Sequence, residues 1–443
     1  MQTRGRFLTG STMGHVVRMT LTGATGITFV FLIDLANLFW VSRIGDPKLV
    51  AAIGYAFAIQ FFSVSSGVGL MIASTALVSR RIGMGDRESA RHMATGSMFI
   101  TAASQAVVAA LIVGFRLPLL DLVGAEGETK MLAARYLAIT VPSLVIMALG
   151  LVASAALRAE GDGKRAMYVT LWSGSVSMVI DPILILTLGL GLDGAAFALV
   201  ISRITLAGMA LRFAIGTHNL LALPSLWGLR QTLRPFFLVA VPAMMTQMST
   251  PFGNYLLTGV ISEFGDDAVA GWAVVNRLTV VAFGGIFALS GAIGGIFGQN
   301  YGAHQYDRLR STLRDSLIFC TGYTLVAWAF LASTSGIVID GFALRGDGIA
   351  VYRAFALVGA GGFLLVGAMF VANAAFNNLG KPTRSTLMNW FRDGVLTLPA
   401  ALLGAAWFGA VGVIYAQYLV GAIAGVLAAF WAHRYLRGLG RQS

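Results

Sequence analysis

Length, composition and charge exclude a soluble protein. The chain has 443 residues, of which 57% are hydrophobic and only 11% are charged, and its mean hydropathy is +0.79. A soluble chain carries roughly a quarter charged residues, so a soluble fold would leave most of this apolar surface exposed to water. The composition therefore predicts an integral membrane protein, in which the 54 glycines let helices pack closely.

The net charge of +12 does not indicate a nucleic-acid partner. The basic residues form short clusters between apolar runs, without a basic stripe interleaved with aromatic side chains. The one cysteine, Cys320, excludes an intrachain disulfide. The basic start of the chain leads into a long apolar run without a cleavage-site pattern, which predicts an uncleaved first span.

Twelve apolar runs are long enough to cross a bilayer, which takes about 20 residues. The expected spans are 14–40, 49–79, 91–115, 131–157, 166–188, 194–214, 236–262, 268–297, 314–335, 350–378, 387–405 and 410–433. An even number places both termini on one side. Of the 31 Lys and Arg residues, 21 lie on the side of the termini, 7 lie on the other side and 3 lie inside spans. Because basic residues accumulate in cytoplasmic loops, this bias predicts cytoplasmic termini.

The chain repeats itself at an offset of 218 to 220 residues. Ile44-Gly45-Asp46 matches Phe264-Gly265-Asp266, and the pair Gly161 and Arg165 matches Gly380 and Arg384. Four such matches in order indicate a duplicated six-span unit. We therefore expect an all-α membrane protein with two six-helix lobes, 1–215 and 236–443, joined by a cytoplasmic linker, 216–235. The lobes should be related by a pseudo-two-fold axis along the membrane normal.

Ionisable residues inside spans mark candidate functional positions because burying them in a bilayer is costly, by roughly 2.5 to 3.5 kcal/mol. Of the 19 acidic residues, 16 lie in loops or near span ends. Asp34 and Asp181 lie at similar depth, roughly 9–10 Å inside the outer ends of spans one and five. A structural role for either acid alone, as a hydrogen-bond partner or turn marker, is as probable as a functional one. The matched pair favours a shared proton or cation site.

Polar neighbours support this site. Asn37 lies one turn from Asp34, and Ser173, Ser177 and Asp181 follow one another at helical spacing. The second half has a polar interior without a matching acid: Asn254 stands 220 residues after Asp34. Its candidate cleft-lining residues are Gln247, Asn254, Arg277, Asn373 and Asn377. Arg277 could equally hold helices together, and Asp393, next to Arg392, is best explained as a local ion pair.

Several motifs resemble the multidrug and toxic-compound extrusion (MATE) family, over essentially the whole chain. They are the span-one acid followed by Ile44-Gly45, Leu77-Val78-Ser79-Arg80, Leu157-Arg158-Ala159-Glu160-Gly161-Asp162, and Ile180-Asp181-Pro182. The acids resemble the DNA-damage-inducible-F-like branch, whose coupling residues lie in the first lobe. The acids that the other main bacterial branch carries in spans seven and ten are absent. The resemblance implies efflux of drug-like, often cationic compounds in exchange for H⁺ or Na⁺.

The same resemblance implies supporting residues. Tyr136 matches a tyrosine of the family, but Ser154 and Ser177 stand where relatives often have asparagines, and Leu199 aligns with a threonine. Fewer oxygen ligands weaken a Na⁺ site more than a proton site, so we expect H⁺ as the coupling ion and Na⁺ as the alternative.

The sequence thus predicts a secondary active multidrug exporter that works by alternating access of a central cleft. We expect no enzymatic activity, because neither a nucleophile–histidine pair nor a nucleotide motif is present, and neither a cofactor nor a bound metal. The expected partners are the bilayer of the bacterial inner membrane and small lipophilic, cationic compounds, handled by a monomer. A lipid or lipid-linked-oligosaccharide flippase is the alternative on the same scaffold, with Arg203 and Arg277 as its candidate pyrophosphate ligands. A channel is a further alternative.

Overall fold

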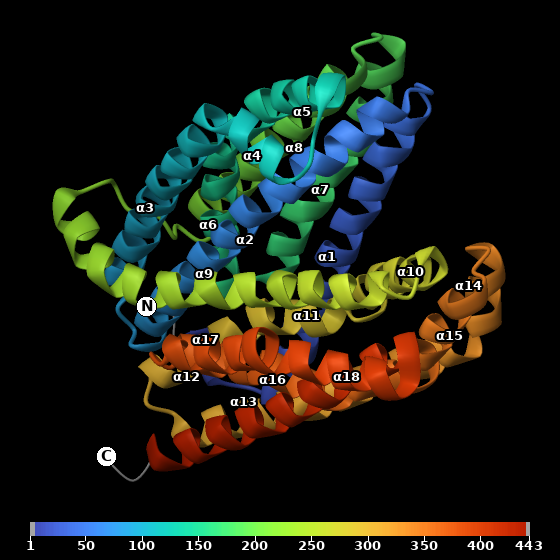
Figure 1. The fold of residues 1–443 in the computed structure, drawn as a ribbon. Helices are drawn as coiled ribbons and strands as arrows, with labels where there is room; N and C mark the ends of the chain where they lie inside the picture. Colours follow the sequence, from blue (N-terminus) through green and yellow to red (C-terminus); the bar gives the residue numbers. More distant parts are fainter. Residues whose placement is uncertain (1–4, 440–443) are drawn as a thin grey trace. The chain divides into compact units, whose positions relative to one another are not determined.

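The computed structural model describes residues 5–439, and these form helices joined by short turns, without a β-strand among them. Residues 1–4 and 440–443, the outermost ends of the two predicted lobes, lie outside the described residues. The all-α class expected from the composition is confirmed. Figure 1 shows the long helices that dominate the chain.

The first half contributes six membrane-length segments, and the second half repeats them. The first six are α1 (Thr12–Ser42), α2 (Pro47–Gly83), α3 (Arg87–Gly114), α5 with α6 (Gly127–Thr140, Leu144–Glu160), α7 (Gly163–Pro182) and α8 (Gly191–Gly216). Those of the second half are α9 (Leu226–Ser262), α10 with α11 and α12 (Asp266–Ala282, Gly284–Ala292, Gly294–Gly302), α13 (Tyr306–Ser333), α15 with α16 (Gly346–Ala354, Ala360–Asn378), and the two segments within α17 and α18 (Pro382–Trp390, Thr397–Leu439). The short helices α4 (Arg116–Leu122) and α14 (Ser335–Gly341) precede α5 and α15.

The number of spans follows from three features of these helices. Among the described residues, nine helical stretches are long and apolar enough to cross a membrane, and the pair formed by α10 and α11–α12, bent by 48°, is a tenth. The 58-residue stretch Pro382–Leu439 contains the non-helical Gly409 (φ 62°, ψ −150°), which divides it into two segments. Helix α9 is not among these nine, but its 37 residues are long enough to cross a membrane, and with it the number of spans is the predicted twelve.

Side-chain caps fix several helix starts. The carboxylate of Asp46 accepts a hydrogen bond from the Lys48 amide (2.9 Å) at the start of α2. Asp86 caps α3 through the Ser89 amide in the same manner (3.0 Å). Because the first amides of a helix have no partner within it, an acceptor at this position stabilises the start by about 1 kcal/mol. The loops between spans are therefore short and end in defined turns.

The duplication is visible in the backbone angles. Left-handed residues (φ > 0) recur at offsets of 218 to 220, which places equivalent turns in both halves. The pairs are Gly45 and Gly265, Gly85 and His304, Gly124 and Ala343, Gly127 and Gly346, Gly161 and Gly380, and Gly191 and Gly409. The weak sequence repeat thus corresponds to a shared set of turns, although two glycines of the first half are His304 and Ala343 in the second.

The contacts of the chain divide it into two compact units. The first unit is residues 25–244, and the second unit is residues 1–24 together with 245–443. In the second unit, the side chain of Phe7 is buried in the same apolar cluster as Trp272 and Phe297. Arg308 holds this N-terminal segment by hydrogen bonds to the carbonyl oxygens of Phe7 (2.8 Å) and Gly10 (2.9 Å). The beginning of α1 is therefore fastened to the unit formed mainly by the second half.

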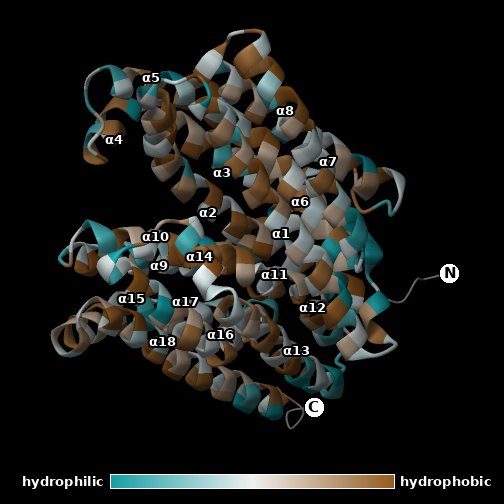
Figure 2. Cartoon of the chain, turned by 90° about the vertical axis from the view of Figure 1, so that its right-hand side faces the viewer, coloured by the Kyte–Doolittle hydropathy of each residue, from teal (hydrophilic) through white to brown (hydrophobic). Residues whose placement is uncertain are grey.

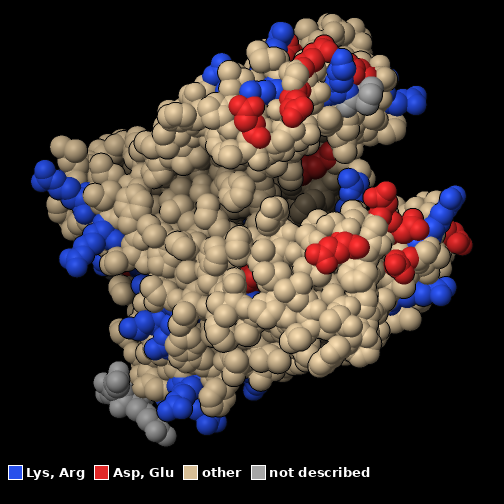
Figure 3. All heavy atoms as spheres, viewed as in Figure 1, with Lys and Arg blue, Asp and Glu red and all other residues tan. Residues whose placement is uncertain are grey.

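Polar and charged residues are concentrated at the ends of the helices. Figure 2 shows hydrophobic residues along the helix lengths and hydrophilic residues at many of the turns. On the face drawn in Figure 3, charged side chains gather near the helix ends, and uncharged surface lies between them. This distribution is the one that a bilayer requires of spanning helices.

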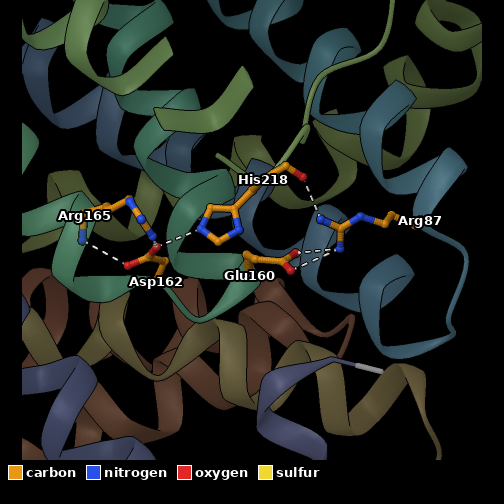
Figure 4. A network of polar contacts seen from close by, with 5 residues as sticks. All are labelled: Arg87, Glu160, Asp162, Arg165 and His218. Atoms are coloured by element: carbon orange, nitrogen blue, oxygen red, sulfur yellow. Dashed lines mark hydrogen bonds and ion pairs between the residues drawn. The ribbon is translucent and has the colours of Figure 1, made fainter. Parts of the chain in front are cut away.

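The segment between α8 and α9 is irregular over 217–225, so it is shorter than the predicted linker 216–235 because α9 begins at Leu226. A polar network fastens it to the first unit (Figure 4). The His218 ring contacts the carboxylate of Asp162 (2.7 Å), and Arg87 donates to the main-chain oxygen of His218 (2.7 Å) and to both oxygens of Glu160 (3.1 and 3.2 Å). Asp162 also caps α7 through the Arg165 amide (3.1 Å).

Burial of Asp162 opposes its ionisation, but the hydrogen bonds from His218 and Arg165 outweigh this effect and hold the pKa of Asp162 well below its usual range. The carboxylate is thus an ionised anchor for the irregular segment.

Candidate functional site

The two predicted acids lie in the first unit, on helices α1 and α7. Asp34 is on α1 and is exposed, whereas Asp181, at the end of α7, is completely buried. Asn37 lies within hydrogen-bonding reach of the Asp181 carboxylate, and the Ser177 hydroxyl is 3.5 Å from its Oδ1. The second oxygen, Oδ2, has no hydrogen-bond partner in the structure. One oxygen of this carboxylate is therefore held by a polar neighbour, while the other is buried without a hydrogen-bond partner.

The other predicted supporting residues divide into two groups. Tyr136 on α5 is buried, and its ring hydroxyl lies close enough to both acids for their charges to interact. Ser173, one turn below Ser177 on α7, donates to the Thr170 carbonyl (3.1 Å), and its own carbonyl accepts from Ser202 on α8 (3.1 Å). Ser154 on α6 is buried, but no contact joins it to the acids within the described structure. The predicted pocket thus includes Asn37, Tyr136 and Ser177, with Ser173 holding α7 to α8.

A buried cation that the sequence did not assign to this site lies beside it. Arg203 on α8 is 6% exposed. Its guanidinium donates to the Thr140 carbonyl (2.8 Å), the Ser143 hydroxyl (2.8 Å) and the side-chain oxygen of Gln60 (3.2 Å). The Gln60 amide in turn donates to the Thr140 hydroxyl (2.7 Å). Arg203 therefore sits in a set of neutral oxygen atoms from α2 and from the break between α5 and α6.

Two of these oxygens, on Thr140 and Ser143, flank a short turn at Pro142. The short 3₁₀ turn Val141–Ser143 directs the Leu144 amide to the carbonyls of Pro142 and Val141. The Thr140 carbonyl, at the start of this turn, accepts hydrogen bonds from the Ser143 hydroxyl (2.6 Å) and from Arg203. The turn between α5 and α6 thus supplies a carbonyl and a hydroxyl oxygen to the buried guanidinium.

The charges of the site lie close enough to affect one another. Asp34 interacts electrostatically with Asp181 and with Arg203, and Arg203 also interacts with Tyr136. No salt bridge joins Arg203 to either acid among the described residues. With both acids ionised, the cluster of Asp34, Asp181 and Arg203 carries one net negative charge, so one bound proton would neutralise it.

The predicted cleft-lining residues of the second half lie in the second unit. The Asn254 amide is 3.5 Å from the Asn276 oxygen, joining α9 to α10. The neighbouring Arg277 is exposed and has no polar partner among the described residues. Asn373 on α16 is buried and accepts from Asn389 (3.0 Å). Gln247 is half-buried on α9, and Asn377 is buried on α16.

Asp393 forms the local ion pair that the sequence predicted. The Arg392 guanidinium donates to both carboxylate oxygens of Asp393 (2.7 Å each) and to the Thr250 hydroxyl (3.1 Å). The pair lies in the π-helical segment Phe391–Leu396 between α17 and α18. Its charge is therefore satisfied within the second unit.

Comparisons with known proteins agree with this architecture. The MatE family model matches residues 24–183 and 242–403. The chain is 24% identical over 434 residues to a protein of Shewanella oneidensis named FAD transporter, covering 96% of each. It is 21% identical over 422 residues to the multidrug export protein MepA of Staphylococcus aureus, covering 93% of this chain and 92% of that protein.

Solved structures share the fold. The crystal structure of a mutant of VcmN, a MATE transporter of Vibrio cholerae, has a TM-score of 0.91 at 23% identity and covers 96% of this chain and 97% of its own. A MOP superfamily transporter of Pyrococcus furiosus has a TM-score of 0.88 at 23% identity, with 99% of each chain covered. The twelve-helix, two-lobe fold is therefore confirmed.

Proposed function

Because this chain belongs to the MATE family, whose members are membrane transporters and not enzymes, we propose that it exports small compounds in exchange for protons. The observation that carries this proposal is the buried carboxylate of Asp181, which has one oxygen without a partner and lies close to Asp34 inside a membrane-spanning bundle. Intramembrane acids of this kind mark ion pathways.

The proposed mechanism uses the net charge of the site. When the site opens to the outside, a proton binds to the acid pair and neutralises it, and substrate leaves. When the site opens to the inside, the proton dissociates and the negative pair again favours a cationic compound. A proton crossing 100 mV supplies about 2.3 kcal/mol, which can drive this exchange. Alternating access, the cytoplasmic termini and the inner-membrane location belong to the same proposal, as does the DNA-damage-inducible-F-like branch.

We propose small lipophilic cations as the main substrates, because the acidic site would attract them. One relative is named a multidrug export protein and another an FAD transporter, so a transport panel should contain both cationic drugs and FAD. The flippase alternative needs several free cations for a pyrophosphate. Of its two candidates, Arg203 donates to three oxygens of its own unit, which leaves only the exposed Arg277.

The test is transport by purified protein in proteoliposomes, driven by an imposed pH gradient or by a Na⁺ gradient. We expect the pH gradient alone to drive transport, and we expect Asp34→Asn and Asp181→Asn each to lower the rate at least about ten-fold, the effect of about 1.4 kcal/mol. Because residues that act as a unit lose activity non-additively, the double variant should be little slower than either single one.

A matched control is Glu128→Gln, which removes an acid from an exposed ion pair with Lys48 and should keep full activity. Unchanged transport in Asp34→Asn would reject its coupling role. If the transport rate of the double variant fell by the product of the two single-variant factors, the shared site would be rejected. Transport driven by Na⁺ but not by the pH gradient would reverse the choice of ion.

A further inference from the structure

The oxygen atoms around Arg203 are of the kinds that bind a hard cation. They are a main-chain carbonyl (Thr140), a hydroxyl (Ser143) and an amide oxygen (Gln60), and each accepts a hydrogen bond from the guanidinium. Carbonyl, hydroxyl and carboxylate oxygens are the ligands that hard metal ions select. The carboxylate of Asp34 interacts electrostatically with Arg203 and with Asp181. Oxygen ligands for a metal cation are therefore present, but the guanidinium occupies the three uncharged oxygens.

We propose that Arg203 is the ion-specificity determinant of the carboxylate site: it supplies permanently the positive charge that Na⁺ would otherwise bring, so the site exchanges protons and excludes Na⁺. This inference rests on the proposed function, in which Asp34 and Asp181 carry the coupling ion. A proton needs only the open oxygen of a carboxylate, such as Oδ2 of Asp181. Na⁺ needs several oxygens, which Arg203 withholds.

Fixed geometry supports this role. Three hydrogen bonds to α2 and to the α5–α6 break hold the guanidinium in a site where the arginine is almost fully buried. The hydroxyl of the adjacent Ser202 donates to the Ser173 carbonyl of α7 (3.1 Å), which fixes α8 against the helix that carries Asp181. Arg203 therefore cannot retreat from the acids by a simple change of side-chain conformation.

A purely structural role is the competing explanation, because Arg203 also donates to the Thr140 carbonyl at the break between α5 and α6. Two substitutions separate the two roles. Arg203→Ala removes the charge and leaves the oxygens free, and Arg203→Gln removes the charge but keeps an amide donor for the carbonyl. If Arg203 excludes Na⁺, each variant should acquire a Na⁺ site. If Arg203 only caps a carbonyl, neither should.

The experiment measures the thermal unfolding of purified protein in detergent at pH 8, with Na⁺ or with choline at the same ionic strength. A ligand that binds the folded state raises the Tm. We expect no Na⁺-specific shift in the wild type and a rise of about 3 °C or more in Arg203→Ala and Arg203→Gln at about 100 mM Na⁺. Equilibrium binding of radioactive Na⁺ should rise from background to about one ion per molecule.

Arg212→Ala is the matched control, because Arg212 lies on the same helix at an exposed position near its end; it should behave as the wild type. Adding Asp181→Asn to Arg203→Ala should abolish the Na⁺ effect, which would place the acquired ion at the carboxylates. Folded Arg203 variants without a Na⁺ response would overturn the inference, and so would a wild type that responds equally. If neither variant folds, Arg203 is a structural cap and the inference fails. The readout is binding and not transport, so the coupling role of the acids is judged separately by the proteoliposome assay.

Discussion

Two turns of the first half have glycine at a positive φ angle where the second half has another residue, so the backbone strain of these turns differs between the halves. Ala343 has φ 48° in the turn where the first half has Gly124 with φ 80°. A side chain in this region costs roughly 1–2 kcal/mol because its Cβ approaches the backbone, whereas glycine carries no such penalty. Ala343 is exposed, and a Cβ at Gly124 would meet no other atom within 4 Å. The strain is therefore purely that of the backbone.

We expect opposite effects when the two residues are exchanged. Ala343→Gly should stabilise the protein by about 0.5–1 kcal/mol, because relief of strain exceeds the entropy that glycine adds to the unfolded chain. Gly124→Ala should destabilise it by about 1 kcal/mol. Thermal unfolding in detergent measures both, and Ala332→Gly, within helix α13, should be destabilising as a reference. If Ala343→Gly and Ala332→Gly changed the stability in the same direction, this explanation would be contradicted.

The candidate site shows what residue patterns can and cannot predict. Depth in the spans and helical spacing are enough to predict that Asp34, Asp181, Asn37 and Ser177 belong to one site. Arg203 carries the same signal, an ionisable residue inside a span, but its partners are not predictable from the sequence. They include a main-chain carbonyl beside the turn at Pro142, and hydrophobic periodicity does not indicate which carbonyl an arginine on another helix will reach.

At the scale of elements, the irregular segment 217–225 depends on few side chains. His218 contacts Asp162, and on α3 the Arg91 guanidinium donates to the Leu221 carbonyl (2.8 Å), while the Thr95 hydroxyl bonds with Ala222 (3.0 Å). The sequence predicted a linker here, at 216–235. Its attachment to α3 could not be predicted, because it uses main-chain oxygens that any sequence provides.

We expect Asp162→Asn to destabilise the first unit by about 1–3 kcal/mol near neutral pH, because asparagine can cap α7 but cannot replace the charged bonds to His218 and Arg165. A carboxylate with a lowered pKa stabilises the fold above the pKa of the unfolded chain, about 3.9, and this contribution decreases as the pH falls further. The difference in Tm between wild type and variant should thus stay constant from pH 7 to about pH 5 and shrink below about pH 4.

The control for this experiment is Asp307→Asn, which removes an almost fully exposed carboxylate paired with Arg310; it should change the stability by less than about 1 kcal/mol. A Tm difference for Asp162→Asn that grows on acidification would contradict the assigned role of the carboxylate.

For the chain as a whole, composition and internal repeats are enough to predict the fold. Twelve apolar runs and the offset of 218 to 220 predicted the spans to within a few residues at most ends, although α9 begins ten residues before the predicted 236. The breaks within spans were not predicted. The π-helical segments Ile183–Thr187 and Phe391–Leu396 lie inside predicted spans, and the hydropathy of the sequence does not distinguish them from α-helix.

The orientation of the whole chain is the remaining structural prediction, and it follows from charge alone. Because basic residues favour the cytoplasm, the 217–225 segment should be inside and the turn before α5 outside. Single cysteines can test this without altering the native thiol, because Cys320 is buried and should label poorly. In intact cells, a membrane-impermeant maleimide should label Glu126→Cys and Asp347→Cys. Leu223→Cys and Asp307→Cys should react only after the membrane is permeabilised. All four positions are exposed, so accessibility within the protein does not limit labelling. The reverse pattern would invert the topology, and it would also reverse the direction in which the proposed proton exchange moves substrate.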